Sequence, residues 1–219
     1  MIVVLCAAGC GESDDPARSA GSAIPASLRT VESGAEDTTD FILAGKRREA
    51  VRSANALDRA ARGQAATDLS AAGVAPAQIR ALKRRAARVA KLAPRGKPID
   101  VALAANRAFE LVPDLFGSYR DPVPPAVTRL DYFDFEAKLE ALAGDRDKVA
   151  RAVSGLDRVW EALREDVLAA GGSAPADRFD AHLRRMHSLV TSRAGVRRLT
   201  REAQHGLELV DQLEAVYAD

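Results

Sequence analysis

The feature that most constrains the fold of this chain is the spacing of apolar residues in its C-terminal half. From Asp145 to Ala169 they recur at alternating intervals of four and three, and two later segments repeat the pattern. Such spacing places the apolar side chains on one stripe of an α-helix. Three helices, each with one buried face, are therefore expected. The stripes consist of Val149, Val153, Leu156, Trp160, Leu163 and Val167, then Phe179, Leu183, Met186 and Val190, then Val196, Leu199, Ala203, Gly206, Val210, Leu213 and Tyr217.

A fourth helix is expected from Pro124 to Ala143, and it carries its own apolar residues. The breaks between these four helices are short, and they fall at residues 144–145, 171–174 and 193–195. Short connections force neighbouring helices to run antiparallel. The sequence therefore predicts an up-down antiparallel four-helix bundle over residues 124–218.

Residues 37–112 are expected to be helical as well. Ala, Arg, Leu and Glu dominate this region, and runs of β-branched residues are missing. Gly and Pro separate about three helices, at residues 37–62, 76–93 and 98–112. The predicted fold class is all-α, and these N-terminal helices either extend the bundle or cap it.

Charge is unevenly distributed along the chain, although the net charge is only +1. Residues 46–97 hold 14 Lys or Arg against three acidic residues, a local net charge of +11. Residues 98–219 hold 16 basic against 21 acidic residues, a local net charge of −5. The molecule is therefore strongly polarised.

Five of the basic residues lie close together on the predicted helix 76–93. They form either a solvated face that pairs in part with the acidic bundle or a contact for an anionic surface. That surface would be anionic lipid, an envelope polymer or an acidic protein. Nucleic acid is not expected, because residues 46–97 contain no aromatic side chain for stacking. The five residues are Lys83, Arg84, Arg85, Arg88 and Lys91.

The first ten residues carry a separate pattern, in which an apolar run ends in Ala7-Ala8-Gly9-Cys10 and polar, acidic chain follows. This resembles the lipobox of bacterial lipoproteins, where small residues precede a cysteine that is lipidated and becomes the mature N-terminus. The resemblance implies that Cys10 carries a lipid and that the protein lies at the cell membrane or outer membrane, facing the periplasm or the exterior. Residues 1–9 would be the end of a signal peptide. Its translation start is expected upstream, because the run is short and no Lys or Arg precedes it.

Residues 10–36 are expected to form a flexible tether between the lipid and a helical domain at residues 37–219. This stretch holds Gly, Ser, Ala, two prolines and several acids, without a sustained apolar period. Such a composition cannot bury enough surface to offset the entropy lost on ordering. Cys6 would leave with the signal peptide, so the mature domain would contain neither a free cysteine nor a disulfide.

Few side chains in the predicted bundle are suited to bind a metal ion or haem. His182 and Met186 lie one turn apart, and Asp131 and Asp134 share a helix face from which they could join His182 across the bundle. A metal or haem site at these four residues is one interpretation. In the other, Met186 fills the core, His182 is a hydrogen-bonded boundary residue, and the two aspartates form a surface ion-pair row with Lys138.

Glu202 and His205 have the Glu-x-x-His spacing of carboxylate-bridged di-metal bundles. The motif occurs once, whereas that chemistry requires it on two helices. The apolar stripe of the last helix also turns both residues away from the centre of the bundle. They are therefore expected to form a surface pair.

Local signatures of enzymes are missing, including the Gly-x-Ser-x-Gly elbow, a phosphate-binding glycine loop and the His-Glu-x-x-His pair. A non-catalytic protein without a cofactor is therefore expected. Two functions stay open. The first is a lipid-anchored interaction or scaffold lipoprotein of the cell envelope. The second is a periplasmic ligand-binding bundle that holds a metal ion or haem, similar to periplasmic four-helix cytochromes in architecture only.

Overall fold

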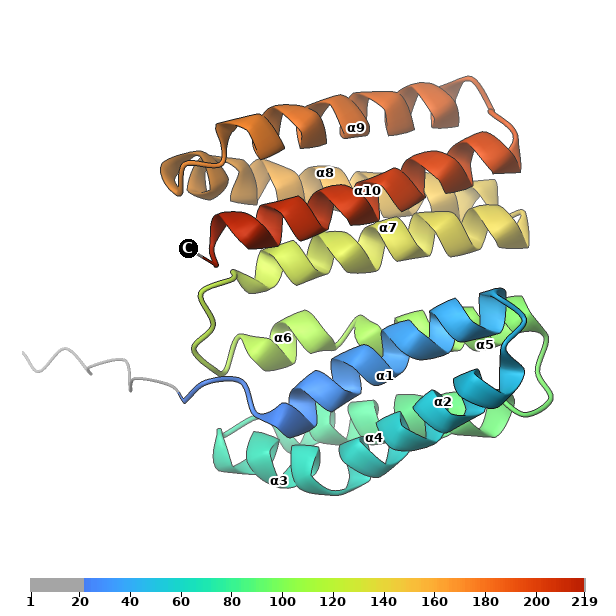
Figure 1. The fold of residues 1–219 in the computed structure, drawn as a ribbon, viewed down its shortest axis with the longest axis vertical. Helices are drawn as coiled ribbons and strands as arrows, with labels where there is room; N and C mark the ends of the chain where they lie inside the picture. The colour runs from blue at the N-terminus through green and yellow to red at the C-terminus, as the bar shows by residue number, and fades with distance from the viewer. Residues whose placement is uncertain (1–21, 219) are drawn as a thin grey trace, which may run out of the picture.

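The computed structural model describes residues 22–218, and this part of the chain forms ten helices (Figure 1). The all-α fold class is confirmed. Within these residues, no helix combines the length and the apolar character that crossing a bilayer requires. The helices are α1 (Ala26–Leu43), α2 (Arg47–Arg62), α3 (Gln64–Ala71), α4 (Pro76–Leu92), α5 (Pro98–Phe109), α6 (Val112–Phe116), α7 (Pro125–Ala143), α8 (Arg146–Ala169), α9 (Ser173–Thr191) and α10 (Val196–Val216).

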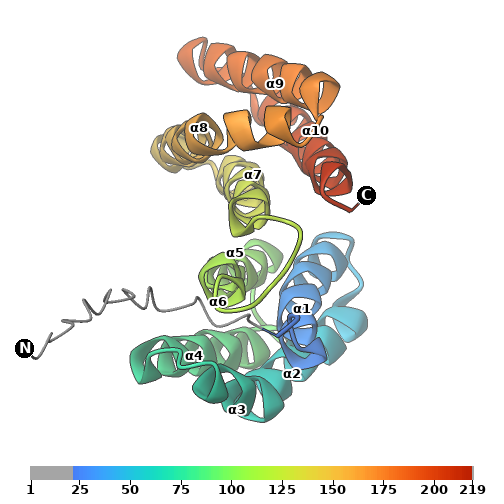
Figure 2. The same ribbon diagram turned by 90° about the vertical axis from the view of Figure 1, so that its left-hand side faces the viewer.

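The ten helices are arranged in two halves, which lie one above the other in Figures 1 and 2. The N-terminal half comprises α1 to α6, and the C-terminal half comprises α7 to α10. Helix α7 packs against α5 and α6, and so joins the halves. A single parallel β-bridge between Ala23 and Arg120 holds the start of the described chain beside the linker that connects α6 to α7.

Helix α1 begins at Ala26, eleven residues before the helix start predicted at residue 37. The tether prediction is therefore wrong for residues 26–36. Leu28, Val31 and Ala35 are buried in this segment, and their spacing of three and four residues gives α1 an apolar face. The predicted signal segment 1–9, the lipidation site Cys10 and the tether up to residue 21 lie outside the described residues.

The N-terminal half contains six helices where about three were predicted. The predicted helix 37–62 is divided by a turn at Gly45, whose φ of 74° favours glycine. Helix α3 lies in a stretch to which no helix was assigned, and α6 follows α5 after a break at residues 110–111. Only α4 and α5 correspond closely to their predicted ranges.

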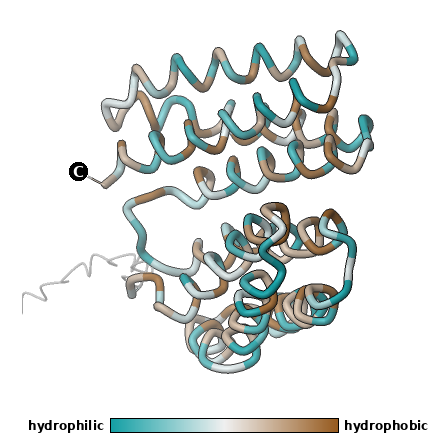
Figure 3. Tube along the Cα trace, turned by 45° about the vertical axis from the view of Figure 1, so that its right-hand side comes forward, coloured by the Kyte–Doolittle hydropathy of each residue, from teal (hydrophilic) through white to brown (hydrophobic). Residues whose placement is uncertain are grey.

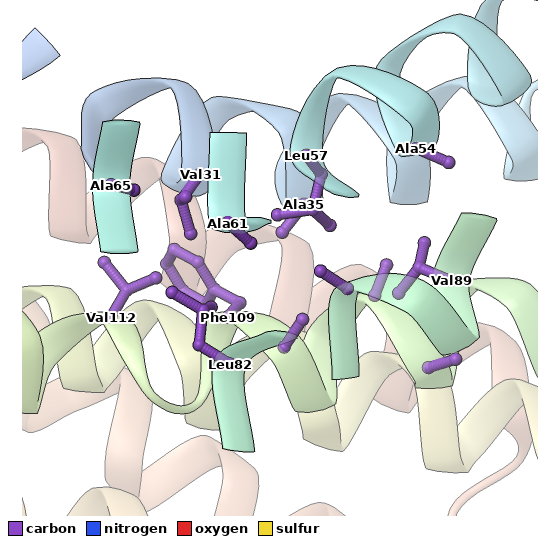
Figure 4. Close-up of a cluster of buried hydrophobic side chains, with 14 of the residues drawn as sticks. Val31, Ala35, Ala54, Leu57, Ala61, Ala65, Leu82, Val89, Phe109 and Val112 are labelled. Atoms are coloured by element: carbon purple, nitrogen blue, oxygen red, sulfur yellow. The ribbon is translucent and has the colours of Figure 1, made fainter. Parts of the chain in front are cut away.

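One continuous apolar core fills the N-terminal half, and small residues dominate it (Figure 4). Ala54, Ala61 and Ala65 face the core in that view, around larger side chains such as Leu57 and Phe109. Helices α1 and α2 approach closely, because a Cβ added at Gly34 would lie 3.0 Å from the Cβ of Leu57. Close helix approach through small side chains is thus the packing principle of this half.

The C-terminal half is a closed ring of four helices, in which α7 contacts α8 and α10, and α9 contacts the same two helices. This arrangement is consistent with the predicted up-down four-helix bundle. Helix α8 is capped by Asp145, whose side chain accepts a 3.0 Å hydrogen bond from the backbone N–H of Lys148. Trp160 is buried, as its stripe predicts, and its indole N–H donates a 2.7 Å hydrogen bond to Asp180.

Two separate apolar clusters make up the core of the C-terminal half, unlike the single core of the other half. One contains Leu156, Trp160 and Phe179, and the other contains Val153 and Met186. The colouring in Figure 3 alternates between hydrophobic and hydrophilic along the helices of both halves, as expected for amphipathic helices. Along α9, buried His182 lies between Phe179 of the first cluster and Met186 of the second.

Candidate functional site

His182, in the middle of α9, lies between carboxylates from two other helices. Its Nε2 is 3.1 Å from Oδ1 of Asp134 on α7, and its Nδ1 is 3.0 Å from Oε1 of Glu202 on α10. The same Glu202 oxygen accepts a 2.8 Å hydrogen bond from Nε of Arg185, which points to the surface. We call these four residues the buried polar network. It connects three of the four helices of the C-terminal half.

A glycine on α10 provides the space for Asp134. A Cβ added at Gly206 would lie 2.3 Å from Oδ2 of that carboxylate, so a larger residue at position 206 would displace Asp134. Oδ2 of Asp134 is buried and has no hydrogen-bond partner among the described residues. The network therefore depends on a close fit between α7 and α10.

The network favours the charged form of His182. Burial lowers the pKa of this imidazole, but the hydrogen bonds to Asp134 and Glu202 outweigh burial and raise it to about 9. Burial raises the pKa of Asp134 above its ordinary value, although the hydrogen bond to His182 opposes this effect. Burial also acts on Glu202, but hydrogen bonds from His182 and Arg185 outweigh it and lower its pKa. Near neutral pH, a protonated His182 is thus hydrogen-bonded to both Asp134 and Glu202.

This geometry holds helices together and leaves no room for catalysis at the imidazole. The His182 side chain is 0% exposed, and both ring nitrogens already have partners. A general base must be within hydrogen-bond reach of the proton it removes, and a solute has no path to this ring. The network thus serves as a polar crosslink.

The structure does not bring together the four residues predicted as metal ligands. Met186 packs in the apolar cluster with Val153, and Asp131 lines a separate cleft with Glu36 of α1. Within residues 22–218, no group of three or more His, Cys, Asp or Glu side chains is arranged to hold a metal ion. Asp134 and His182 do meet, but as an ion pair.

Glu202 is not the surface residue that its position on the stripe predicted, because its side chain is only 15% exposed and bonds to His182. The side chain of His205 is 42% exposed, in keeping with the predicted surface position, and lies 3.6 Å from Glu208. The predicted surface row of Asp131, Asp134 and Lys138 is also wrong. Asp134 is buried, and Lys138 donates a 2.7 Å hydrogen bond to Gln204.

Asp131 belongs to an acidic group between the two halves. It lines a cleft of about 220 Å³ together with Glu36 of α1 and Asp211 of α10. Burial and the neighbouring carboxylates raise the pKa of Asp131 well above its ordinary value, and they raise that of Glu36 to about 8. The halves therefore meet at a group of carboxyls in which burial and mutual repulsion favour the protonated forms of Glu36 and Asp131.

The predicted basic residues on α4 divide into two groups. Arg85 is engaged with α5, because it donates a 2.6 Å hydrogen bond to Glu110 and another to the carbonyl of Arg107. The others form no ion pair with any described residue. We call them, together with Arg80, the α4 basic face, which consists of Arg80, Lys83, Arg84, Arg88 and Lys91.

Comparison of the chain with protein families, with curated proteins and with solved structures finds no match.

Proposed function

We propose that this chain is a non-catalytic interaction module of the cell envelope, anchored by a lipid on Cys10 and oriented by the α4 basic face against anionic headgroups. The observation that carries the proposal is the distribution of charge around α4. Its buried face consists of Ile79, Leu82, Ala86 and Val89. Arg80, Arg84, Arg88 and Lys91 are exposed on the opposite side of the helix, and Lys83 is half-buried at the edge of this face. None of the five has an ion-pair partner among the described residues.

Electrostatics make such a face effective at a membrane. A basic residue close to an anionic leaflet contributes roughly 1 kcal/mol, and the contribution falls off within a Debye length. The two acyl chains of a diacylglyceryl group at Cys10 would anchor the protein stably by themselves. Five basic residues on one helix would therefore add orientation more than attachment. A lipid and a basic patch together would hold the domain in one orientation.

The start of the described chain lies close to the helices that lead into α4, which suits an anchor at Cys10. Ser27, in the first turn of α1, donates a 2.5 Å hydrogen bond to Asp68 on α3, and α4 begins five residues after α3 ends. Cys10 precedes the first described residue, Ser22, by twelve positions, which span at most about 40 Å when extended. Helix α4 is about 25 Å long. A lipid at Cys10 would therefore leave α4 free to lie along the headgroups.

The first test is the mass of the protein extracted in detergent from its own organism. The proposal expects a chain that begins at Cys10 and carries a diacylglyceryl group, with or without a further acyl chain. A chain that retains residues 1–9 without lipid would overturn the anchored function.

The second test isolates the α4 basic face from the lipid. The full chain with Cys10→Ser is floated with neutral vesicles and with vesicles rich in anionic lipid. Binding is expected only to the anionic vesicles, and it should weaken as salt rises. The fourfold Gln variant of Lys83, Arg84, Arg88 and Lys91 should lose this binding.

A matched control removes the same charge from the C-terminal half, where Arg151, Arg158, Arg178 and Arg184 are also exposed and free of ion pairs with described residues. The fourfold Gln variant of these arginines should still bind. Equal loss in the two variants, or binding that is insensitive to salt, would contradict the proposed role of α4.

A further inference from the structure

A second cationic site lies in the C-terminal half, in a groove between α9 and α10. The groove has a volume of about 240 Å³. We call it the arginine groove. Its lining residues are Arg185, Ser188, Leu189, Arg198, Arg201 and Glu202.

Two of the three arginines lack an internal partner. Arg198 and Arg201 are exposed and form no ion pair with any described residue. Both lie in the first turns of α10, a helix whose first turn contains no acidic residue. Positive charge near a helix N-terminus is unfavourable, because the helix dipole is positive there. These two guanidinium groups are therefore poorly compensated by the protein itself.

The third arginine is held in place by the buried polar network. Nε of Arg185 donates to Glu202, which lies in turn against His182. This contact uses the Nε–H of the guanidinium, and its two terminal nitrogens have no hydrogen-bond partner among the described residues. The single carboxylate of the groove is thus already engaged by two cationic groups, and it does not neutralise Arg198 or Arg201.

We propose that the arginine groove binds a phosphate-type oxyanion, either free phosphate or the phosphomonoester end of a small molecule. Guanidinium groups are planar forks that match phosphate oxygens in bidentate pairs, and three of them line one groove. Ser188 adds a hydroxyl at the same site for a further hydrogen bond. Glu202 acts as a positioning residue, because it fixes Arg185 without facing the anion as a free charge.

The inference is independent of the lipid anchor, because the groove and the α4 basic face are in different halves. In the test, the full chain is titrated with inorganic phosphate at low ionic strength. Binding is measured by the heat released in calorimetry or by the line width of the phosphate signal in phosphorus NMR. Saturable binding is expected, and the double variant Arg198→Gln/Arg201→Gln should weaken it at least tenfold.

The matched control is Arg178→Gln/Arg184→Gln, which removes two exposed arginines of α9 that do not line the groove. It should bind phosphate like the unmodified chain. No saturable binding, or equal weakening in both double variants, would overturn the inference, since only general electrostatic attraction would then remain.

A second titration, with glycerol phosphate, distinguishes the two sources of the anion. Binding as tight as that of inorganic phosphate, and lost in the same groove variant, assigns a phosphomonoester ligand. Much weaker binding assigns free phosphate, since the groove would then reject the added carbon chain. Because all four substituted arginines are exposed, the variants are expected to fold, and circular dichroism checks this.

Discussion

The two halves of the molecule solve the same packing problem in different ways. The N-terminal half has one apolar core, and its fully buried polar residues are uncharged: Thr38, Thr39 and Asn106. The C-terminal half buries three ionisable residues, Asp134, Glu140 and His182, and its apolar core is divided in two. Small side chains set the spacing of the helices in the first half, whereas hydrogen bonds between charged groups set their register in the second.

Breaking the buried pair should have the largest effect. His182→Leu leaves the Asp134 carboxylate buried without its cation, which is expected to cost about 3–5 kcal/mol of the free energy of unfolding. The double variant Asp134→Leu/His182→Leu replaces both groups by apolar side chains of similar shape. It should recover most of the loss, as measured by urea unfolding. If the double variant is as unstable as the single one, the cost comes from packing and not from the stranded charge.

A large-to-small substitution in the core of the N-terminal half should have the second-largest effect on stability. Leu57 of α2 is fully buried against Gly34 of α1. Leu57→Ala is expected to lower the free energy of unfolding by about 2–5 kcal/mol, because apolar burial is lost and a cavity is left. No partner substitution of a charged residue should rescue it, in contrast with His182→Leu. A cost below about 1 kcal/mol would mean that the tightly packed helices close the cavity, contrary to a rigid alanine-rich core.

A change of pH should weaken the C-terminal half by less than removal of His182, because the neutral ring still fills its site and keeps one N–H that donates to a carboxylate. The pKa of His182 is raised from 6.5 to about 9, so its contribution to stability is complete below pH 6.5 and is lost as pH rises through 9. Unfolding in urea should therefore be easier at pH 9 than at pH 6.5.

The double variant Asp134→Leu/His182→Leu is the reference for this experiment. It keeps Glu36, whose pKa is raised from 4.5 to about 8, so its contribution to stability is lost as pH rises between these values, which overlap the window of His182. The unmodified chain should lose more stability than the reference, and the difference belongs to the Asp134–His182 pair. Equal losses would assign the whole pH effect to the acidic group between the halves.

The smallest losses of stability are expected when a glycine is replaced by alanine, and one glycine in each half allows a comparison. Gly206→Ala forces Asp134 to move, because the new Cβ would lie 2.3 Å from its carboxylate, and about 1–3 kcal/mol of destabilisation is expected. Gly34→Ala meets the Cβ of Leu57 at 3.0 Å and needs a smaller shift. Melting temperatures should therefore fall more for Gly206→Ala. The reverse order would show that α1 and α2 are less able to adjust than α7 and α10.

The sequence predicts the helices of the C-terminal half well, because long apolar stripes and short breaks leave few alternatives. It predicts the N-terminal half less well, because alanine gives little contrast between buried and exposed positions. Helix α1 could have been found from Leu28, Val31 and Ala35, but the Ser, Gly and acidic residues around them resemble a tether. Short helices such as α3 carry too few residues to show a period.

The buried polar network was only half visible in the sequence. The sequence suggests that Asp134 and His182 meet, but it places Glu202 at the surface because this residue lies beside the centre of its stripe. A helix in a closed ring contacts two neighbours, so its buried arc is wider than one stripe, and flanking residues face a partner. The role of Gly206 was invisible for a related reason, since the sequence does not tell which side chain on α7 needs the space.

The bridge between Ala23 and Arg120 determines where a mechanical load would act. Its backbone hydrogen bond, 2.9 Å from the N–H of Arg120 to the carbonyl of Ser22, ties the start of the described chain to the linker between the halves. Arg29 reinforces this point through an ion pair with Asp121 and a position 4.8 Å above the ring of Phe116. Tension applied at the N-terminus would thus be shared between α1 and the linker, and the junction of the two halves would be the first part of the fold to feel a pull.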